Sequence, residues 1–481
     1  MAEYNGGLTK DAEVMLGNPK RALIAMAVPV MIANLVQSIN NVIDTVWLTA
    51  IGIEAQAAVN VIFPLFFVMI GFGNGIAVGT SQALARRIGA MDRRGANAVA
   101  SQAVMMTLVI SIVLATVFTL MADRLILMSG GASNLEACMA YAIPIFLSIP
   151  SILLGGLFGG LLRSEGAAKR SMAIHVVAAV MNIVLDPIFI FVLDMGLTGA
   201  AIATAVSMTI PLAVSIYWYF LRMSTFVRIP LGGFRFDRSI DWDILRVGIP
   251  ASMEVILMAM VILAMDVIIE GISPIEGVAI YGNGWKLIDL FFMPALALGF
   301  AIVPICAAAL GARDTQKIGE VYVLALKYGI LICIGITLIL ILFGQYLVVP
   351  FSYSEGTESI RGQMAYFVAV CAAFMPFTPL GYTSVGYFQA MGWGYKALLI
   401  TATVNLSRIP VCLFLAATVG TLDAVWWGIV ASEIGGSTIG GLYGMYSVRR
   451  LIRGGYPQLL SEESFVKDRF LRPSLRTVSR S

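Results

Sequence analysis

The chain has 481 residues, of which 59% are hydrophobic and only 12% are charged, and its mean hydropathy is +0.89. This composition excludes an ordinary water-soluble fold, because soluble domains carry about twice that share of charged residues. The 31 Lys and Arg residues nearly balance the 28 Asp and Glu residues, so the net charge of +3 does not indicate a nucleic-acid-binding protein. The composition instead predicts a protein embedded in a lipid bilayer.

Long apolar stretches follow one another along the chain, separated by charged residues. A helix of about 20 apolar residues is long enough to cross a bilayer. Helices are the expected form because backbone groups cannot stay unpaired in lipid, and because the stretches lack the alternation of barrel strands. We therefore predict an all-α, polytopic fold with twelve transmembrane helices at residues 21–50, 57–86, 97–122, 135–162, 171–194, 197–221, 245–271, 278–310, 318–348, 362–390, 396–418 and 425–447.

Lys and Arg residues are concentrated in alternate connections between these helices, for example Arg86 and Arg87 after the second helix. Cytoplasmic loops of membrane proteins carry such an excess of basic residues. We therefore expect a multi-pass protein of the cell membrane with both termini in the cytoplasm. Its polar N-terminal segment would be residues 1–20, and residues 451–481 would form a flexible cytoplasmic tail.

Several motifs recur at about half the chain length, in the same order. The matched pairs are Val28-Pro29 with Ile249-Pro250, Gly89-Ala90-Met91-Asp92 with Gly311-Ala312-Arg313-Asp314, and Asn182 and Pro187 with Asn405 and Pro410. Such a repeat predicts two pseudo-symmetric lobes of six helices, related by an axis along the membrane normal. We place the N-lobe at 21–222, a cytoplasmic linker at 223–244 and the C-lobe at 245–450, with a cavity between the lobes that is reached by alternating access.

Polar residues lie near the predicted bilayer centre in the N-lobe. Spacings of three and four residues place them on one face of the first helix: Asn34, Gln37, Asn41 and Asp44. In the fifth helix Asn182 and Asp186 share a face, and Thr204 of the sixth helix lies at a similar depth. A buried carboxylate must be protonated or offset by a cation, so these groups suit Na⁺ or H⁺. The alternative is that the two acids are structural anchors and that the amides join helices.

These residues resemble the multidrug and toxic compound extrusion (MATE) family, in particular its branch with bacterial DNA-damage-inducible and archaeal members. The resemblance is carried by Asn182-Ile-Val-Leu-Asp186-Pro187, by Gly199-Ala-Ala-Ile-Ala-Thr204, and by Pro29 and Asp44 fifteen residues apart. It implies a V-shaped, twelve-helix exporter that exchanges drugs for Na⁺ or H⁺. By matching positions it implies a cation site, with Na⁺ as a candidate ion, at Asp44, Asn182, Asp186 and Thr204. Pro29 would be the point where the first helix bends, and Gln37 would be part of the nearby drug cleft. Asn34 and Asn41, which share the polar face of Gln37, are our further candidates for the substrate cleft.

The C-lobe departs from this pattern. The repeat places Arg408 where the N-lobe has Asp186, and Glu433 where it has Thr204. We predict that Arg408 and Glu433 form a structural ion pair, in which the fixed cation of arginine replaces an exchangeable one.

Glu254 in the seventh helix is an alternative coupling residue, because another branch of the same family has a glutamate there together with an aspartate in the tenth helix. The absence of an acid from the tenth helix here favours the N-lobe. Asp266, Lys286 and Asp289 are candidates for a second network of charged residues in the C-lobe. Lys286 and Asp289 are three residues apart on one helix, and we favour the interpretation that they simply neutralise each other.

Bulky side chains are numerous in the second and eighth helices, where they suit flat lipophilic cations or simply pack: Phe63, Phe66, Phe67, Met69, Tyr281, Trp285, Phe291, Phe292 and Met293. His175, the single histidine, lies on the helix face of Asn182 and would either relay a proton or be hydrogen-bonded in place. The five cysteines show no metal or disulfide spacing and are expected in the core: Cys138, Cys306, Cys333, Cys371 and Cys412.

Three functions remain open from the sequence. The favoured one is a cation-coupled antiporter that exports amphipathic, often cationic organic compounds and works as a monomer with no cofactor besides Na⁺ or H⁺. A lipid-linked oligosaccharide flippase would need several arginines in its cavity, and Arg408 is the one arginine in the middle of a predicted helix. The third, an integral membrane enzyme, is not expected because no nucleophile-base constellation is found. The sequence also has no Walker motif, so ATP-driven pumping is not expected.

Overall fold

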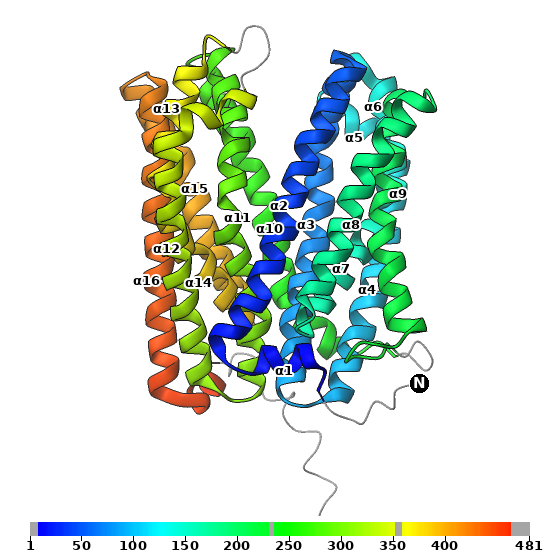
Figure 1. The fold of residues 1–481 in the computed structure, drawn as a ribbon, viewed down its shortest axis with the longest axis vertical. Coiled ribbons are helices and arrows are strands. Elements are labelled where there is room, and N and C mark those ends of the chain that lie inside the picture. Colours follow the sequence, from blue (N-terminus) through cyan, green and yellow to red (C-terminus); the bar gives the residue numbers. More distant parts are fainter. Residues whose placement is uncertain (1–7, 230–234, 352–357, 463–481) are drawn as a thin grey trace, which may run out of the picture.

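The computed structural model describes residues 8–229, 235–351 and 358–462, and the regular structure there is helical. By length and composition, ten helices of this part of the chain suffice to cross a membrane, and a pair bent by 47° adds an eleventh passage. Helix α16 (Leu422–Glu462) is not among the helices that meet this criterion, and we count it as the twelfth passage. It packs against α14 (Thr378–Ala390) and α15 (Gly394–Thr418) and runs alongside them in Figure 1. The predicted all-α fold of twelve helices in two lobes is confirmed.

The N-terminal half begins with the short helix α1 (Lys10–Leu16) and then has six passages. They are α2 (Pro19–Ile51), α3 (Ile53–Gly89), α4 (Arg93–Leu120), the bent pair α6 (Leu135–Leu147) and α7 (Ile149–Ser164), α8 (Ala168–Pro187) with the π-helical turn η2 (Ile188–Val192), and α9 (Gly196–Ile216) with the π-helical turn η3 (Tyr217–Leu221). Between α4 and α6 lie the short elements α5 (Ala122–Met128) and η1 (Gly131–Asn134).

The C-terminal half repeats this arrangement. Its passages are α10 (Arg238–Glu270), α11 (Glu276–Gly311), α12 (Thr315–Leu347), α13 (Arg361–Ala372) with α14 (Thr378–Ala390), α15 (Gly394–Thr418) and α16 (Leu422–Glu462). The short turns η4 (Val349–Phe351) and η5 (Met375–Phe377) follow α12 and α13.

Two boundaries differ from the sequence prediction. Helix α10 begins at Arg238, inside the segment predicted as linker, because Asp237 caps it by accepting a hydrogen bond from the Ser239 amide. Helix α16 continues to Glu462, into the predicted flexible tail, since glycines lower helix propensity without forbidding a helix. The remainder of the tail, residues 463–481, lies outside the described residues.

The two halves meet at the end of the molecule where α1 lies and diverge toward the other end (Figure 1). Close contact is made by α3 against α10 and α11, and by α2 against α11. Glycines permit it: a Cβ atom on Gly89 would lie 1.9 Å from the carbonyl oxygen of Ala308, and one on Gly311 would lie 1.9 Å from that of Arg86. The repeat-related glycines Gly89 and Gly311 therefore pack reciprocally across the seam between the halves.

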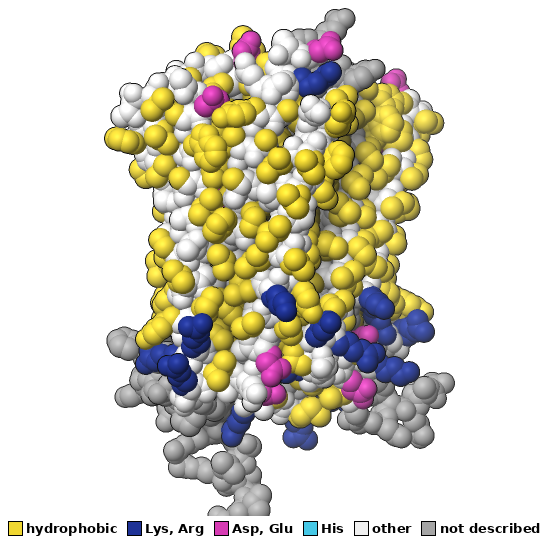
Figure 2. All heavy atoms as spheres, turned by 60° about the vertical axis from the view of Figure 1, so that its left-hand side comes forward, with side chains coloured by type: hydrophobic (Ala, Val, Ile, Leu, Met, Phe, Trp, Pro, Cys, Tyr) yellow, Lys and Arg dark blue, Asp and Glu magenta, His cyan; other side chains and the backbone are white. Residues whose placement is uncertain are grey.

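We call the end where the halves meet the basic end, because Lys and Arg side chains gather there (Figure 2). Arg86 of α3 forms an ion pair with Asp243 of α10, and Arg246 donates to the same carboxylate at 2.7 Å. Asp243 is thus held between one arginine from each half. Because these groups are mostly shielded from solvent, this contact is a stronger link between the halves than an exposed ion pair would be.

A buried carboxylate also fixes the segment between η3 and α10 at the basic end. Glu165, in the turn between α7 and α8, accepts hydrogen bonds from the Tyr219 hydroxyl at 3.0 Å and from the Phe226 amide at 2.8 Å. Burial raises the pKa of Glu165 to about 7, although these donors and Arg170 act in the opposite direction.

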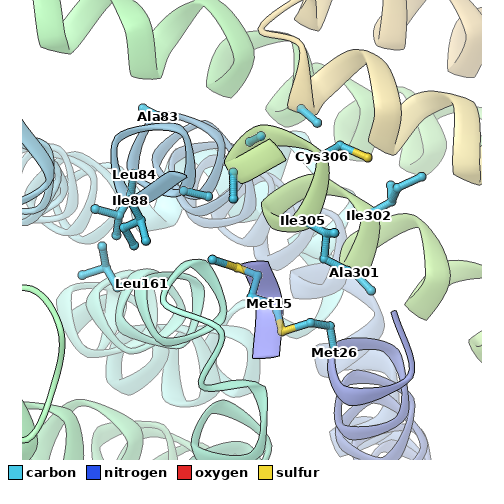
Figure 3. Close-up of a cluster of buried hydrophobic side chains, with 14 of the residues drawn as sticks. Met15, Met26, Ala83, Leu84, Ile88, Leu161, Ala301, Ile302, Ile305 and Cys306 are labelled. Atoms are coloured by element: carbon cyan, nitrogen blue, oxygen red, sulfur yellow. The ribbon is translucent and has the colours of Figure 1, made fainter. Parts of the chain in front are cut away.

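Helix α1 lies across the seam and fills it from below. The Met15 side chain is 1% exposed and lies among Leu84, Leu161 and Ile305, which come from both halves (Figure 3). Lys317 of α12 donates from Nζ to the carbonyl oxygens of Met15 at 3.2 Å and Gly17 at 2.7 Å, so a C-terminal half residue caps α1.

Replacing Met15 with alanine is expected to lower the thermal midpoint of the protein in detergent, because emptying a packed site costs about 2–5 kcal/mol. The midpoint is measured by heating followed by size-exclusion chromatography. Met128→Ala is the matched control, since Met128 is 84% exposed. Equal midpoints for the two variants would show that Met15 does not stabilise the seam.

Candidate functional site

A chain of hydrogen bonds joins the two acids of the N-terminal half through two amides. Asn40 on α2 donates from Nδ2 to Asp44 Oδ2 at 3.0 Å and to Asn182 Oδ1 at 2.9 Å. Asn182 on α8 donates in turn to Asp186 Oδ1 at 3.0 Å. The structure therefore brings Asp44, Asn182 and Asp186 together, with Asn40 between them.

The carboxyl groups of Asp44 and Asp186 also interact with each other directly. Two carboxylates at hydrogen-bonding range repel each other strongly in a site of low dielectric. One of them must therefore take up a proton, or a cation must bind between them. The site is shielded on the α8 side, where Asn182 and Asp186 are 1% and 3% exposed. Chemically, this arrangement can take up one positive charge and release it again.

Helical spacing alone predicts one polar stripe on α2 that includes Asn41 and Asp44, and it does not single out Asn40. The structure splits that stripe. Gln37 donates to Asn41 at 3.2 Å, while Asp44 pairs with Asn40 one turn away. The spacing of four residues between Asn40 and Asp44 was a usable signal, but the contact with Asn182 joins residues far apart in the chain and depends on how α2 packs on α8.

Other predicted site residues lie around this chain without joining it. Among the described residues, the Thr204 hydroxyl has no hydrogen bond to either acid, and its carbonyl oxygen accepts from Ser207. Tyr141 of α6, which was not predicted, lies near enough to interact electrostatically with both Asp44 and Asp186. Asn34 is half-buried, and its Nδ2 has no partner among the described residues.

Pro29 and His175 occupy the same two helices. Helix α2 runs through the buried Pro29 from Pro19 to Ile51 without interruption. His175 packs against Gly159 of α7, where a Cβ atom would lie 2.5 Å from its Nε2, and it interacts with the nearby Arg163. No hydrogen bond within the described residues links His175 to the two acids.

Arg408 of α15 and Glu433 of α16 lie together in the C-terminal half, each 5% exposed, with Nη2 and Oε2 2.6 Å apart. Ser437 donates to the other carboxylate oxygen at 3.4 Å, and the guanidinium lies 5.4 Å from the ring centre of Trp285. The predicted ion pair has the geometry of a fixed structural contact. It forms part of the wall of a cleft with about 690 Å³ of empty space, partly open to solvent, lined also by Asp289, Phe292 and Tyr382.

The secondary candidates of the C-terminal half are not assembled into one network. Glu254 accepts a hydrogen bond from Gln389 of α14 at 3.1 Å. Lys286 and Asp289 form no ion pair, which corrects the prediction of mutual neutralisation: Lys286 is exposed, whereas Asp289 turns toward the cleft. Asp266 interacts with Glu270 on its own helix.

The predicted aromatic and methionine residues divide between core and surface. Met69 and Tyr281 are 0% and 2% exposed and belong to the hydrophobic cores of the two halves. Phe63 is exposed and packs on Phe67, with ring centres 4.8 Å apart. Trp285 and Phe292 line the cleft, Phe66 and Phe291 pack against the cores, and Met293 is half-buried. All five cysteines are buried, which confirms that they belong to the core, and each is a free cysteine in this structure.

Comparisons with known proteins agree with this architecture. The family model MatE matches residues 29–188 and 250–414. The multidrug export protein MepA of Staphylococcus saprophyticus subsp. saprophyticus is 26% identical over 417 residues, which cover 86% of this chain and 91% of that protein.

Solved structures resemble the chain over nearly its full length. A MATE crystal structure in complex with MaL6 has a TM-score of 0.90 and 32% identity, covering 92% of this chain and all of the other. An outward-facing multidrug resistance MATE transporter of the MOP superfamily has a TM-score of 0.90 and 31% identity, covering 93% of this chain and all of the other. The matched helices, their division into two halves and the family model agree, and the chain belongs to the MATE family of transporters.

Proposed function

We propose that this protein is an antiporter that exports amphipathic, often cationic organic compounds in exchange for Na⁺ or H⁺. The observation that carries the proposal is the linkage of Asp44 and Asp186 through Asn40 and Asn182. Two interacting carboxyl groups from α2 and α8 need one positive charge between them. Binding of that charge changes the electrostatic interaction between Asp44 on α2 and Asp186 on α8. Binding and release of the ion are thereby coupled to movement of these two helices.

We also propose that the basic end faces the cytoplasm and that the structure represents the outward-open state. The positive-inside rule supports this orientation of the basic end. The resemblance to an outward-facing MATE transporter and the contact between Gly89 and Gly311 support closure at that end. Alternating access then requires the Arg86–Asp243 contact to separate when the transporter opens to the cytoplasm.

The export of drug-like compounds is inferred from relatives and from the cleft in the C-terminal half. A related protein bears the name multidrug export protein, and a related structure holds MaL6. Trp285, Phe292 and Tyr382 give the cleft aromatic faces, and Asp289 adds an acidic group that suits cationic compounds. A flippase is not favoured, because it would need arginines in its cavity to bind the phosphate of its substrate. Arg408 already pairs with Glu433 and is therefore unsuited to bind phosphate.

The test is export of a fluorescent cationic dye by the purified protein in liposomes under imposed Na⁺ or pH gradients. Wild-type protein is expected to export the dye with at least one of these gradients. Asp186→Asn keeps the size of the side chain but removes its charge, so gradient-driven export should fall to background. Glu254→Gln should retain most of the activity, because Glu254 lies outside the linked acids. Normal export by Asp186→Asn together with loss in Glu254→Gln would place coupling in the C-terminal half instead.

A further inference from the structure

The orientation of the Asn40 amide is determined by its neighbours. Asp186 accepts from Asn182 Nδ2, so Asn182 must present its oxygen to Asn40. Asn40 must therefore donate to Asn182, and the second hydrogen of the same nitrogen goes to Asp44 Oδ2. Both hydrogens of Asn40 Nδ2 therefore take part in hydrogen bonds. If the amide were turned over, Asn40 Oδ1 would face two other oxygens, Asp44 Oδ2 and Asn182 Oδ1. The carbonyl oxygen Oδ1 of Asn40 is left as an acceptor with a fixed position.

That oxygen is buried with no donor. The Asn40 side chain is 1% exposed, and neither Asn40 Oδ1 nor Asp44 Oδ1 accepts a hydrogen bond from any of the described residues. A buried oxygen without a partner costs about 1–3 kcal/mol. The two oxygens belong to residues that are hydrogen-bonded to each other, and the Asp44 carboxyl group also interacts with Asp186.

We propose that Asn40 Oδ1 is a ligand for Na⁺ at the coupling site, together with Asp44 and Asp186; this inference rests on the proposed antiport function. Amide and carboxylate oxygens are the hard ligands that alkali cations prefer. One proton shared by Asp44 and Asp186 would remove the repulsion between two ionised carboxylates but leave Asn40 Oδ1 without a partner. A Na⁺ ion serves all three residues at once, so Asn40 makes the site selective for a metal cation.

The alternative role for Asn40 is a purely structural bridge between α2 and α8. A structural bridge and an ion ligand differ in what their removal changes. Loss of a bridge lowers stability and the maximal transport rate under any driving ion. Loss of a ligand raises the Na⁺ concentration needed for a half-maximal effect, and it leaves transport driven by a proton gradient, where this exists, less affected.

The experiment measures the thermal midpoint of the full-length protein against NaCl, at constant ionic strength with choline chloride, and export driven by a Na⁺ gradient. Wild-type protein is expected to be stabilised by Na⁺. Asn40→Leu, which is similar in shape but has no oxygen, should raise the half-effective Na⁺ concentration about tenfold or more. Asn40→Ser keeps one side-chain oxygen, so its half-effective Na⁺ concentration should lie between those of the wild type and Asn40→Leu. This variant provides the test if Asn40→Leu does not fold. Asn405→Leu makes the same change in α15 of the C-terminal half and should leave the half-effective Na⁺ concentration for the thermal midpoint as in wild type. Export is not compared for this variant, because Asn405 lines the cleft.

Each outcome separates this inference from the proposed function. An unchanged half-effective Na⁺ concentration in Asn40→Leu and Asn40→Ser overturns the role of Asn40 and leaves the antiport proposal standing. The same holds if Na⁺ has no effect on wild-type protein while a proton gradient drives export that Asp186→Asn abolishes. Absence of export under either gradient would overturn both.

Discussion

Arg408→Ala is expected to abolish or severely reduce the yield of folded protein, at a cost of about 3–5 kcal/mol. Arg408 and Glu433 are each 5% exposed, and their charged atoms are 2.6 Å apart between α15 and α16. Removing the guanidinium leaves the buried Glu433 carboxylate with the Ser437 hydroxyl, at 3.4 Å, as its remaining hydrogen-bond donor within the part of the chain that the structure describes. It also removes the cation that lies over the ring of Trp285.

Replacing both partners should be far less harmful than replacing one. In Arg408→Leu combined with Glu433→Leu no buried charge remains, and the desolvation cost of the pair disappears with it. The measurement is the amount of monodisperse protein and its thermal midpoint for each single variant and for the double variant. If Arg408→Ala is as stable as the double variant, the pair is not a buried structural contact.

Gly89→Val is expected to prevent closure at the basic end and to reduce export to background. A Cβ atom at residue 89 would lie 1.9 Å from the Ala308 carbonyl oxygen and 2.6 Å from its carbonyl carbon. These are backbone atoms of α11, so no side-chain rotation relieves the clash and the halves must move apart. Gly311→Val should act in the same way, because residue 311 lies against the Arg86 carbonyl oxygen at the same distance.

The measurement is dye export together with the distance between spin labels placed on both halves at the basic end. Longer distances than in wild-type protein are expected for both glycine variants. Gly335→Val is the matched control, because Gly335 is a helical glycine of α12 with open space around it. Wild-type distances and wild-type export in Gly89→Val would show that the halves do not need this close contact.

Composition and periodicity alone determined the architecture of this protein. Apolar stretches of spanning length leave the helix as the reasonable backbone form in lipid, so twelve helices followed from counting. The matched motifs, such as Gly89 and Gly311, predicted two related halves, and the structure shows these two glycines on opposite sides of the seam. The acids at 44 and 186 could be singled out because a charged side chain in an apolar stretch is costly and rarely accidental.

The partners of those acids were decided by tertiary structure. Sequence spacing places Asn41 and Asp44 on one helix face, but the rotation of α2 against α8 turns Asn40 inward and leaves Asn41 exposed. In the same way, the polar segment before residue 20 gave no sign that Met15 would be buried in the seam between the halves. Helical periodicity reports which residues share a face, whereas the identity of the facing helix depends on packing between segments more than a hundred residues apart.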